Sequence, residues 1–292
     1  MAKIIVRVPA TSANLGAGFD SLGLALKLYY TVIVEEPTAE WKVNHALGED
    51  IPTDKNNLIV QSILAVDPKI QPHQLTVISD VPIAHGLGSS TTAVVAGIKI
   101  ANSLGELNLS ADEQITLGSK IEGHPENVAS AILGGLTVST YENEVATSTS
   151  LETGDLATLM YIRPDGISEV ASRKKLPRKL DFFEAVASSA RANVFVALMA
   201  QQKYKEALKF IEGDKFHEPF REDLVPEIAT IREAAHKLSI DGTYLSGAGP
   251  TIATIGSKDE LIQLRLELQK MDLNGSLRIL DIDKDGATVR GE

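Results

Sequence analysis

Residues Pro82–Asn102 read PIAHGLGSSTTAVVAGIKIAN, a loop rich in glycine and serine that runs directly into an apolar segment with helical spacing. Gly86 and Gly88 allow backbone torsions that other residues avoid, and they let a ligand approach the main chain closely. A helix that begins near Ser89 presents unpaired N–H groups and the positive end of its dipole to an anion. The pattern therefore predicts a phosphate-binding turn between a strand and a helix.

The loop has no lysine, which separates it from the common nucleotide-binding motifs. No Gly-Lys-Ser/Thr follows, so a Walker A loop is excluded, and Thr91 stands at the third glycine of the dinucleotide fingerprint G-x-G-x-x-G. The hydroxyls of Ser89 and Ser90 can bind phosphate oxygens or complete a Mg²⁺ shell instead. The alternative is a plain strand-turn-helix corner in which the two serines cap the helix.

The composition is typical of a soluble globular protein: of 292 residues, 43% are hydrophobic and 23% are charged. The length favours roughly two domains of about 150 residues. The net charge of −11 makes nucleic acid and anionic membranes poor partner candidates, and the lack of cysteine excludes disulfides and Cys-ligated metal sites. Arg7 and Pro9 break the first apolar run, and Lys27 and Lys99 break the longest ones. We therefore expect a cytoplasmic protein without a signal peptide or a membrane span.

Strand-like and helix-like segments follow one another along the chain. Alternating or β-branched runs predict strands at 3–8, 26–36, 74–81, 132–142, 156–162, 242–247, 251–256 and 276–283. Helical spacing predicts helices at 56–66, 89–102, 110–123, 181–200, 203–212, 221–238 and 257–271, two of them with capping boxes at Ser110/Glu113 and Ser257/Glu260. The polar stretch 142–155 is either a hairpin connection or the approach to a domain boundary. We expect an α+β protein of two lobes, residues 1–155 and 156–292.

Two further glycine-rich stretches are PATSANLGAGFDSLGLAL at Pro9–Leu26 and LSGAGPTIATIG at Leu245–Gly256. Together with the first, they resemble in order and spacing the signature motifs of the small-molecule kinase superfamily named for galactokinase, homoserine kinase, mevalonate kinase and phosphomevalonate kinase. The resemblance extends from the first ten residues to beyond residue 250. It implies an N-terminal nucleotide lobe like domain 2 of ribosomal protein S5, a ferredoxin-like α/β C-terminal lobe, and an active site between them.

In this superfamily the middle motif wraps the ATP phosphates and the last motif supports that loop. Pro82–Thr92 match the pattern P-x-x-x-G-L-G-S-S-[TA]-[TA], and Ser246–Thr251 match S-G-[AS]-G-P-[ST]. The resemblance therefore implies ATP as the phosphoryl donor and Mg²⁺ as its cation, held by Ser90 and Glu122. It assigns ATP binding to Pro82, Ile83, Ala84, His85, Gly86, Leu87, Gly88, Ser89, Ser90, Thr91, Thr92, Gly247 and Gly249.

Four segments on the acceptor side are similar to the homoserine kinase branch. EGHPENVASAILGG at 122–135 has Glu126 in place of the usual Asp, and the first motif contains the core N-x-G-x-G-F-D. HEPFREDLVP at 217–226 and SEVASRKKLP at 168–177 resemble the other two segments. Glu169 stands where relatives have Thr, and we assign it no role. The resemblance implies L-homoserine as the acceptor.

The resemblance also implies roles for the matched polar residues. The catalytic and substrate-binding set is expected to be Asn14, Asp20, His124 and Asn127, with Asp20 on the substrate ammonium. Arg173 and Arg221 are expected to bind the substrate carboxylate, because a guanidinium fork grips a carboxylate bidentately. For the hydroxyl proton there are two hypotheses. Either it leaves late to the phosphate, which the resemblance favours, or a carboxylate or His124 is a general base.

The reaction that the resemblance implies moves the γ-phosphoryl group of ATP to the hydroxyl of L-homoserine, giving O-phospho-L-homoserine on the route to threonine. A mevalonate-type kinase of the same superfamily is one alternative, although the two arginines and the E-G-H-P segment argue against it. A catalytically silent binding relative is another, although neither the phosphate loop nor the acceptor segments are damaged. Homodimers are common in the superfamily, so a homodimer is a candidate assembly.

Overall fold

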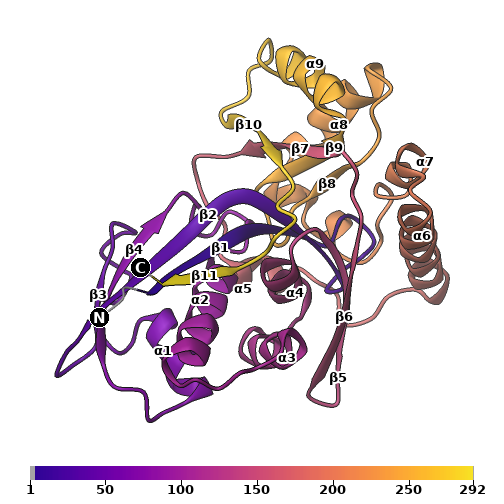
Figure 1. Cartoon of the computed structure of the whole chain (residues 1–292). Coiled ribbons are helices and arrows are strands. Elements are labelled where there is room, and N and C mark those ends of the chain that lie inside the picture. The colour runs from indigo at the N-terminus through magenta and orange to yellow at the C-terminus, as the bar shows by residue number, and fades with distance from the viewer. Residues whose placement is uncertain (1–3, 292) are drawn as a thin grey trace.

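The computed structural model describes residues 4–291 and contains two sheets with helices packed on them (Figure 1). The strands are β1 (Ile4–Ala13), β2 (Leu22–Pro37), β3 (Lys42–Asn44), β4 (His73–Ser79), β5 (Leu136–Glu142), β6 (Val145–Leu151), β7 (Ala157–Ile162), β8 (Thr243–Leu245), β9 (Ile252–Gly256), β10 (Ser276–Asp281) and β11 (Thr288–Gly291). The helices are α1 (Leu58–Val66), α2 (Ser89–Leu104), α3 (Ala111–Glu122), α4 (Glu126–Leu133), α5 (Glu169–Arg173), α6 (Phe182–Ala200), α7 (Tyr204–Leu208), α8 (Glu227–Lys237) and α9 (Lys258–Leu268). This arrangement confirms the expected α+β class.

The large sheet has seven strands, in the order β11-β1-β2-β4-β3 with the β5–β6 hairpin added to β2. Its centre is the long antiparallel pair of β1 and β2, where Val6, Val8 and Val32 are completely buried. The register of this pair shifts between Pro9 and Ala10, and Pro9 has no N–H to donate to the ladder there. Helices α1 to α4 lie together on one side of this sheet (Figure 1). The turn that we predict to bind phosphate leads directly into α2.

The small sheet has four antiparallel strands in the order β10-β7-β9-β8. Helices α8 and α9 pack beside each other against this sheet (Figure 1). Leu261 and Leu264 of α9 and Ile231 of α8 belong to a second cluster of buried apolar residues beneath them. Burial of these apolar side chains holds α8 and α9 against the small sheet.

The chain returns to the large sheet at its C-terminal end. Leu26 of β2 bridges Ile282, and β11 pairs with β1 from Ile4↔Gly291 to Arg7↔Thr288. The crossing to the small sheet lies between Leu151 and Ala157, the region where we placed the boundary between the two expected domains. The last residues of the expected second domain therefore belong to the first sheet. Lys3, the first residue of the expected first strand, lies outside the described residues.

Local signals in the sequence match the structure closely at several element ends. Both capping boxes have the reciprocal hydrogen bonds that the sequence predicts. The polar stretch 142–155 holds β6, which forms a hairpin with β5. Asn143 and Glu144 both have positive φ, 52° and 62°, as a two-residue type I′ turn requires. The hairpin interpretation of this stretch is thus confirmed.

Two helices are much shorter than predicted, and α9 ends at Leu268 where we expected Met271. The segment expected as a helix at 221–238 opens with the end of one 3₁₀ turn and a second 3₁₀ turn at Glu222–Leu224, and α8 begins only after Pro226. The residue before a proline is pushed out of the helical region, and Val225 accordingly has φ −139° and ψ 64°. The helix expected at 203–212 covers only 204–208.

Candidate active site

The three glycine-rich stretches meet in space. Ser246 Oγ donates to the carbonyl of Gly86 at 2.6 Å, which joins the last motif to the phosphate loop. The Gly247 N–H donates to Ala13 O at 3.2 Å, and the Thr11 N–H donates to Leu87 O at 3.1 Å. These bonds bring all three motifs to the wall of one cavity of about 420 Å³.

Most of the site residues predicted from sequence line this cavity: Asn14, Asp20, Ile83, Ala84, Gly86, Gly88, Ser89, Ser90, Thr91, Glu122, His124, Asn127, Arg173, Arg221, Gly247 and Gly249. Pro82, His85, Leu87 and Thr92 do not line it. The side chains of Leu87 and Thr92 are completely buried, and His85 hydrogen-bonds the carbonyls of Ile83 and Arg163. The side chains of Leu87, Thr92 and His85 therefore shape the loop and do not reach into the cavity.

The phosphate loop leaves the start of α2 open to a ligand. Gly88 is the N-cap residue with φ +66°, and neither a side-chain cap nor an acidic residue occupies the first turn. The interpretation that Ser89 and Ser90 merely cap the helix is therefore wrong. A Cβ on Gly86 would lie 2.2 Å from Ser246 O, so the close packing of the loops requires glycine there. The first turn of α2 thus has the uncapped N–H groups that an anion site at a helix start requires.

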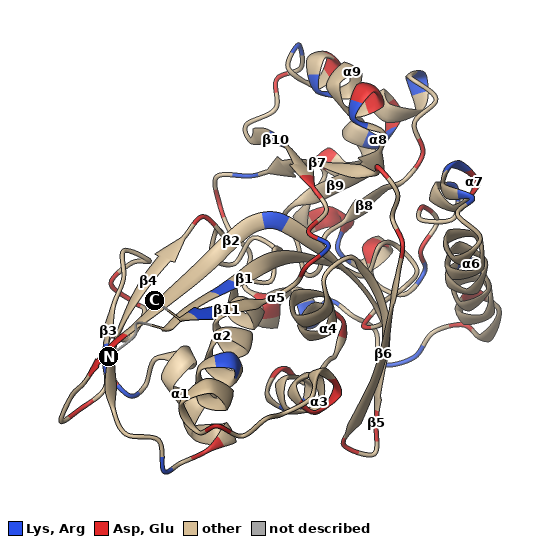
Figure 2. Cartoon of the chain, in the orientation of Figure 1, with Lys and Arg blue, Asp and Glu red and all other residues tan. Residues whose placement is uncertain are grey.

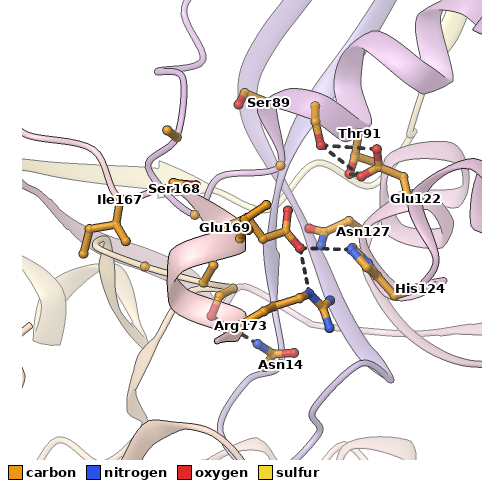
Figure 3. Close-up of a pocket in the computed structure, with 18 of the residues that line it drawn as sticks. Asn14, Ser89, Thr91, Glu122, His124, Asn127, Ile167, Ser168, Glu169 and Arg173 are labelled. Atoms are coloured by element: carbon orange, nitrogen blue, oxygen red, sulfur yellow. Dashed lines mark hydrogen bonds and ion pairs between the residues drawn. The ribbon is translucent and has the colours of Figure 1, made fainter. Parts of the chain in front are cut away.

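A carboxylate and two hydroxyls lie beside this helix start (Figure 3). Ser90 Oγ donates to Glu122 Oε2 at 3.0 Å, and Thr91 Oγ1 donates to the same oxygen at 2.6 Å. Burial raises the pKa of Glu122, and the bond from Thr91 and the nearby His124 charge oppose that rise. Such hard oxygen ligands suit Mg²⁺.

His124 lies between two carboxylates. Its Nδ1 is 3.0 Å from Glu126 Oε1, and its Nε2 is 3.4 Å from Glu169 Oε1. Burial alone would lower the pKa of His124, but the hydrogen bonds to Glu126 and Glu169 outweigh it and raise that pKa to about 10. At neutral pH the ring is an imidazolium with both nitrogens protonated, so it has no free lone pair for a proton.

Glu169 also holds Arg173, as Figure 3 shows. Arg173 Nε donates to Glu169 Oε1 at 2.9 Å, while its two terminal nitrogens donate to both oxygens of Asp20, at 3.1 and 3.2 Å. The bond from His124, opposed by burial and aided by Arg173, lowers the pKa of Glu169 to about 2. In this structure the two groups expected to bind the substrate's opposite charges thus bind each other.

Arg221 is a buried guanidinium without a carboxylate partner. It is 2% exposed, its Nη1 donates to Gly247 O and His217 Nδ1, both at 3.1 Å, and its Nε has no hydrogen bond. Within residues 4–291 it forms no ion pair. Burial, helped by the charge of Arg173, lowers the pKa of Arg221 to about 10. Burying an unpaired charge is costly, so the site favours an anion.

Asn14 and Asn127 hold the walls of the cavity together. Asn14 has φ +76°, accepts the Asp20 N–H at 3.0 Å, and donates to Gly247 O at 3.3 Å. Asn127 accepts from Thr11 Oγ1 at 2.6 Å and donates to Glu126 Oε1 at 2.8 Å. Both amides therefore connect the first motif with other parts of the site.

Asp20, His124 and Glu126 each place a potential metal-binding atom within 4.8 Å of the others. Both nitrogens of His124 face carboxylates, so a metal ion in this cluster would have to displace a proton from the ring. The hydroxyl of Ser90 and the carboxylate of Glu122 instead offer hard oxygen ligands of the kind that Mg²⁺ prefers.

Comparisons with known proteins agree with this geometry. The family described as "GHMP kinases N terminal domain" matches residues 57–135, and "GHMP kinases C terminal" matches residues 195–272. A homoserine kinase of Lactiplantibacillus plantarum is 43% identical over 288 residues, 98% of this chain and 99% of that protein. The chain belongs to the homoserine kinase family.

Solved structures of this family share the fold. A Listeria monocytogenes structure, provisionally assigned as a homoserine kinase, has a TM-score of 0.88 at 37% identity and covers 99% of both chains. A homoserine kinase structure from Cytophaga hutchinsonii has a TM-score of 0.87 at 21% identity, covering 99% of this chain and 97% of its own. The second likeness shows the fold alone. As a family member, this chain is an ATP-dependent kinase with an alcohol acceptor.

Several residues of the site had no role in the sequence analysis. Glu126 was noted only as a departure from the usual Asp, and it proves to be the second carboxylate on His124. Phe19 lies under the guanidinium groups of Arg173 and Arg221, each 5.8 Å from its ring centre. The pattern offered one signal for Phe19, its place in the N-x-G-x-G-F-D core.

Proposed function

We propose that this chain transfers the γ-phosphoryl group of ATP to the hydroxyl of L-homoserine, releasing ADP and O-phospho-L-homoserine for threonine biosynthesis. One observation carries the proposal. A single cavity combines an uncapped helix N-terminus, which suits a triphosphate, with a buried unpaired guanidinium, which suits the carboxylate of an amino acid. The names of the similar proteins support the same acceptor.

The phosphates of ATP would lie at the start of α2, where the loop N–H groups are free. Ser90 and Glu122 would hold Mg²⁺, which neutralises charge on the transferring phosphoryl group when it is bound. Next to the loop is a second, mainly apolar cavity of about 230 Å³ that shares Ile83, Ser89 and Ser90 with the first. With Tyr30 and Leu47 in its wall, it suits the base of the nucleotide.

Homoserine would bind on the opposite part of the cavity wall. Arg221 offers the substrate carboxylate a site without a competing anion, whereas Arg173 is already paired with Asp20. For the proposed contacts the Asp20–Arg173 pair must open, so that Asp20 receives the ammonium and Arg173 joins Arg221 on the carboxylate. The bond from Arg173 Nε to Glu169 Oε1 does not have to break for this exchange.

The protonated state of His124 favours transfer without a histidine base. Phosphoryl transfer passes through a loose transition state, so positioning and charge stabilisation dominate. An imidazolium cannot remove the hydroxyl proton, but its charge can stabilise the developing negative charge beside it. The hydroxyl proton then leaves late, to the transferred phosphate.

The test is product identification. The purified protein, Mg²⁺-ATP and L-homoserine should give a phosphomonoester signal in ³¹P NMR with the mass of O-phospho-L-homoserine. ATP hydrolysis without that product would refute the proposal. A catalytically silent relative would consume no ATP at all.

The finer description of the lobes is also a proposal. Apart from α5 to α7 and two 3₁₀ turns, which lie between β7 and α8, the chain order is β7-α8-β8-β9-α9-β10. With the strand order β10-β7-β9-β8, this order supports a ferredoxin-like second lobe. For the first lobe, the helices on one side of the large sheet support the nucleotide lobe that the resemblance implies.

For location and assembly we propose a cytoplasmic enzyme with a homodimer as a candidate state. Within the described residues, one helix, α6, is long and apolar enough to cross a membrane by length and composition alone. Figure 2 shows α6 mostly without charge, while α9 carries charges of both signs. Phe182 and Phe183 are more than 70% exposed, and a second copy of the chain is one way to cover them.

A further inference from the structure

His217 lies in the interior, against the proposed carboxylate site. Its side chain is completely buried and stacks on Phe19, with the ring centres 5.4 Å apart. Its Nε2 is 3.1 Å from the carbonyl of Gly16, and its Nδ1 is 3.1 Å from Arg221 Nη1. One ring therefore touches both the first glycine-rich loop and the unpaired guanidinium.

These two contacts define the state of the ring. The Gly16 carbonyl can only accept, so Nε2 carries the proton; the Arg221 guanidinium can only donate, so Nδ1 must be the acceptor. A second proton would place an N–H of His217 against an N–H of Arg221. Burial, with the Arg221 charge adding to it and the Asp214 carboxylate opposing it, lowers the pKa of His217 to about 4. The ring is neutral in one tautomer.

Because the neutral His217 ring accepts from it, the Arg221 guanidinium is held in one position. Its Nη1 takes both hydrogen bonds that the group makes within residues 4–291, one to His217 and one to Gly247 O. The guanidinium carbon of Arg221 lies 5.8 Å from the centre of the Phe19 ring, and His217 stacks on the same ring. Nε is buried without a hydrogen-bond partner, and Arg221 itself lines the cavity.

We propose that His217 is the positioning residue for the substrate carboxylate. As an obligate acceptor it fixes the Arg221 guanidinium, and in the wild type its bond to the Gly16 carbonyl sets the tautomer that makes Nδ1 the acceptor. The ring thus holds the carboxylate site in one orientation, which favours a substrate with a carboxylate. This role rests on the proposed function.

Two replacements separate the role from simple core packing. His217→Phe keeps the ring volume and the stacking on Phe19 but removes the acceptor. His217→Asn places an amide oxygen near the position of Nδ1 and so restores the acceptor, while it loses the bond to Gly16. A residue needed only for packing would tolerate Phe better than Asn; an acceptor for Arg221 requires the reverse order.

The experiment compares steady-state kinetics for L-homoserine and for 3-amino-1-propanol, the analogue without a carboxylate. In His217→Phe we expect the KM for homoserine to rise about 10- to 100-fold, the size that loss of a hydrogen bond to a charged group gives, with kcat and the KM for ATP nearly unchanged. The kinetics with 3-amino-1-propanol should not change. In His217→Asn the KM for homoserine should stay within a few-fold of the wild type.

The outcomes are distinguishable. A wild-type protein that does not turn over homoserine refutes the proposed function, and the role of His217 with it. Wild-type turnover with an unchanged homoserine KM in His217→Phe refutes the role of His217 alone. Equal losses with homoserine and 3-amino-1-propanol also refute it, because they indicate a packing defect. If His217→Phe does not fold, a homoserine KM raised 10-fold or more in His217→Asn, with the KM for ATP unchanged, refutes the acceptor role.

Discussion

Glu126 and Glu169 flank His124, and removing the charge of one of them should lower the pKa of the His124 ring. An opposite charge in contact shifts a pKa by ~1–3 units. Glu169 is the weaker neighbour, since it is 3.4 Å away with a side chain 47% exposed, whereas Glu126 is 3.0 Å away and buried. We therefore expect Glu169→Gln to lower the pKa of His124 from about 10 by ~1 unit, near the small end of that range. The remaining bond to Glu126 should keep His124 protonated at pH 7.

The assay is a pH titration of ¹⁵N-labelled histidine by NMR, with His124→Gln to assign the signals. In the wild type the His124 ring should stay protonated through pH 8.5, and its midpoint should fall in Glu169→Gln. Glu184→Gln, a change at an exposed position on α6, is the matched control and should leave the midpoint unchanged. A wild-type midpoint near 6.5 would refute the claim that Glu126 and Glu169 raise the pKa of His124.

The contact between His124 and Glu169 also predicts how the free energy of unfolding should change with pH. Because the pKa of His124 is raised above 6.5 in the folded state, its contribution to stability is complete below pH 6.5 and fades as the pH rises toward about 10. Glu169→Gln should therefore lower the free energy of unfolding more at pH 6 than at pH 10. Denaturant unfolding at both pH values measures the difference, and an equal loss at both would contradict the pairing.

Four other predictions concern the proposed roles of single residues. In His124→Gln, whose amide still donates a hydrogen bond, kcat should fall about 10-fold or less, whereas loss of a general base costs ~10²–10⁴-fold. Gly88→Val should abolish fluorescent-nucleotide binding, because a Cβ there would lie 2.0 Å from Thr11 Oγ1 at φ +66°; unchanged affinity in a folded variant would contradict the loop's role. Asp20→Asn should raise the homoserine KM ~10- to 100-fold with kcat nearly unchanged, and a loss confined to kcat would speak for a base instead. Glu122→Gln should raise the Mg²⁺ concentration needed for half-maximal rate, and an unchanged Mg²⁺ dependence would exclude Glu122 as a ligand.

The sequence predicts best where a local rule determines the backbone. Gly88 and Ser89 mark the start of α2, and the two capping boxes mark the starts of α3 and α9, because caps are satisfied within one turn. The α+β class follows from the alternation of the segments. The lengths of helices near Pro226 follow less directly, because the proline effect competes with an apolar pattern that continues through it.

Other features depend on contacts between distant parts of the chain. β11 is a four-residue strand whose partner is the first strand, so no local pattern identifies it. The short helix α5 ends at Arg173, the first residue of the basic run RKKLPRK at 173–179, where charge alone favours a solvated segment. The pairing of Arg173 with Asp20 spans 153 positions in sequence and appears only when the two lobes meet.

In the site, too, some features can be predicted from local sequence and others depend on distant contacts. Its ligand-facing residues are recognisable from motifs, but the protonation states of His124 and His217 are not. One histidine is charged because carboxylates face both nitrogens, and the other is neutral because it is buried against a guanidinium. These opposite outcomes arise from tertiary neighbours, which a single sequence does not supply.

The most direct test of the central claim is ATP turnover with a panel of acceptors. ADP release should be measured with L-homoserine, mevalonate and L-threonine at equal concentrations, with each phosphorylated product confirmed by mass. We predict a kcat/KM for L-homoserine at least ~100-fold above the other two, since only homoserine combines the two charges with a primary hydroxyl of the right reach. Equal turnover of mevalonate, or no preference for homoserine over threonine, would contradict the account.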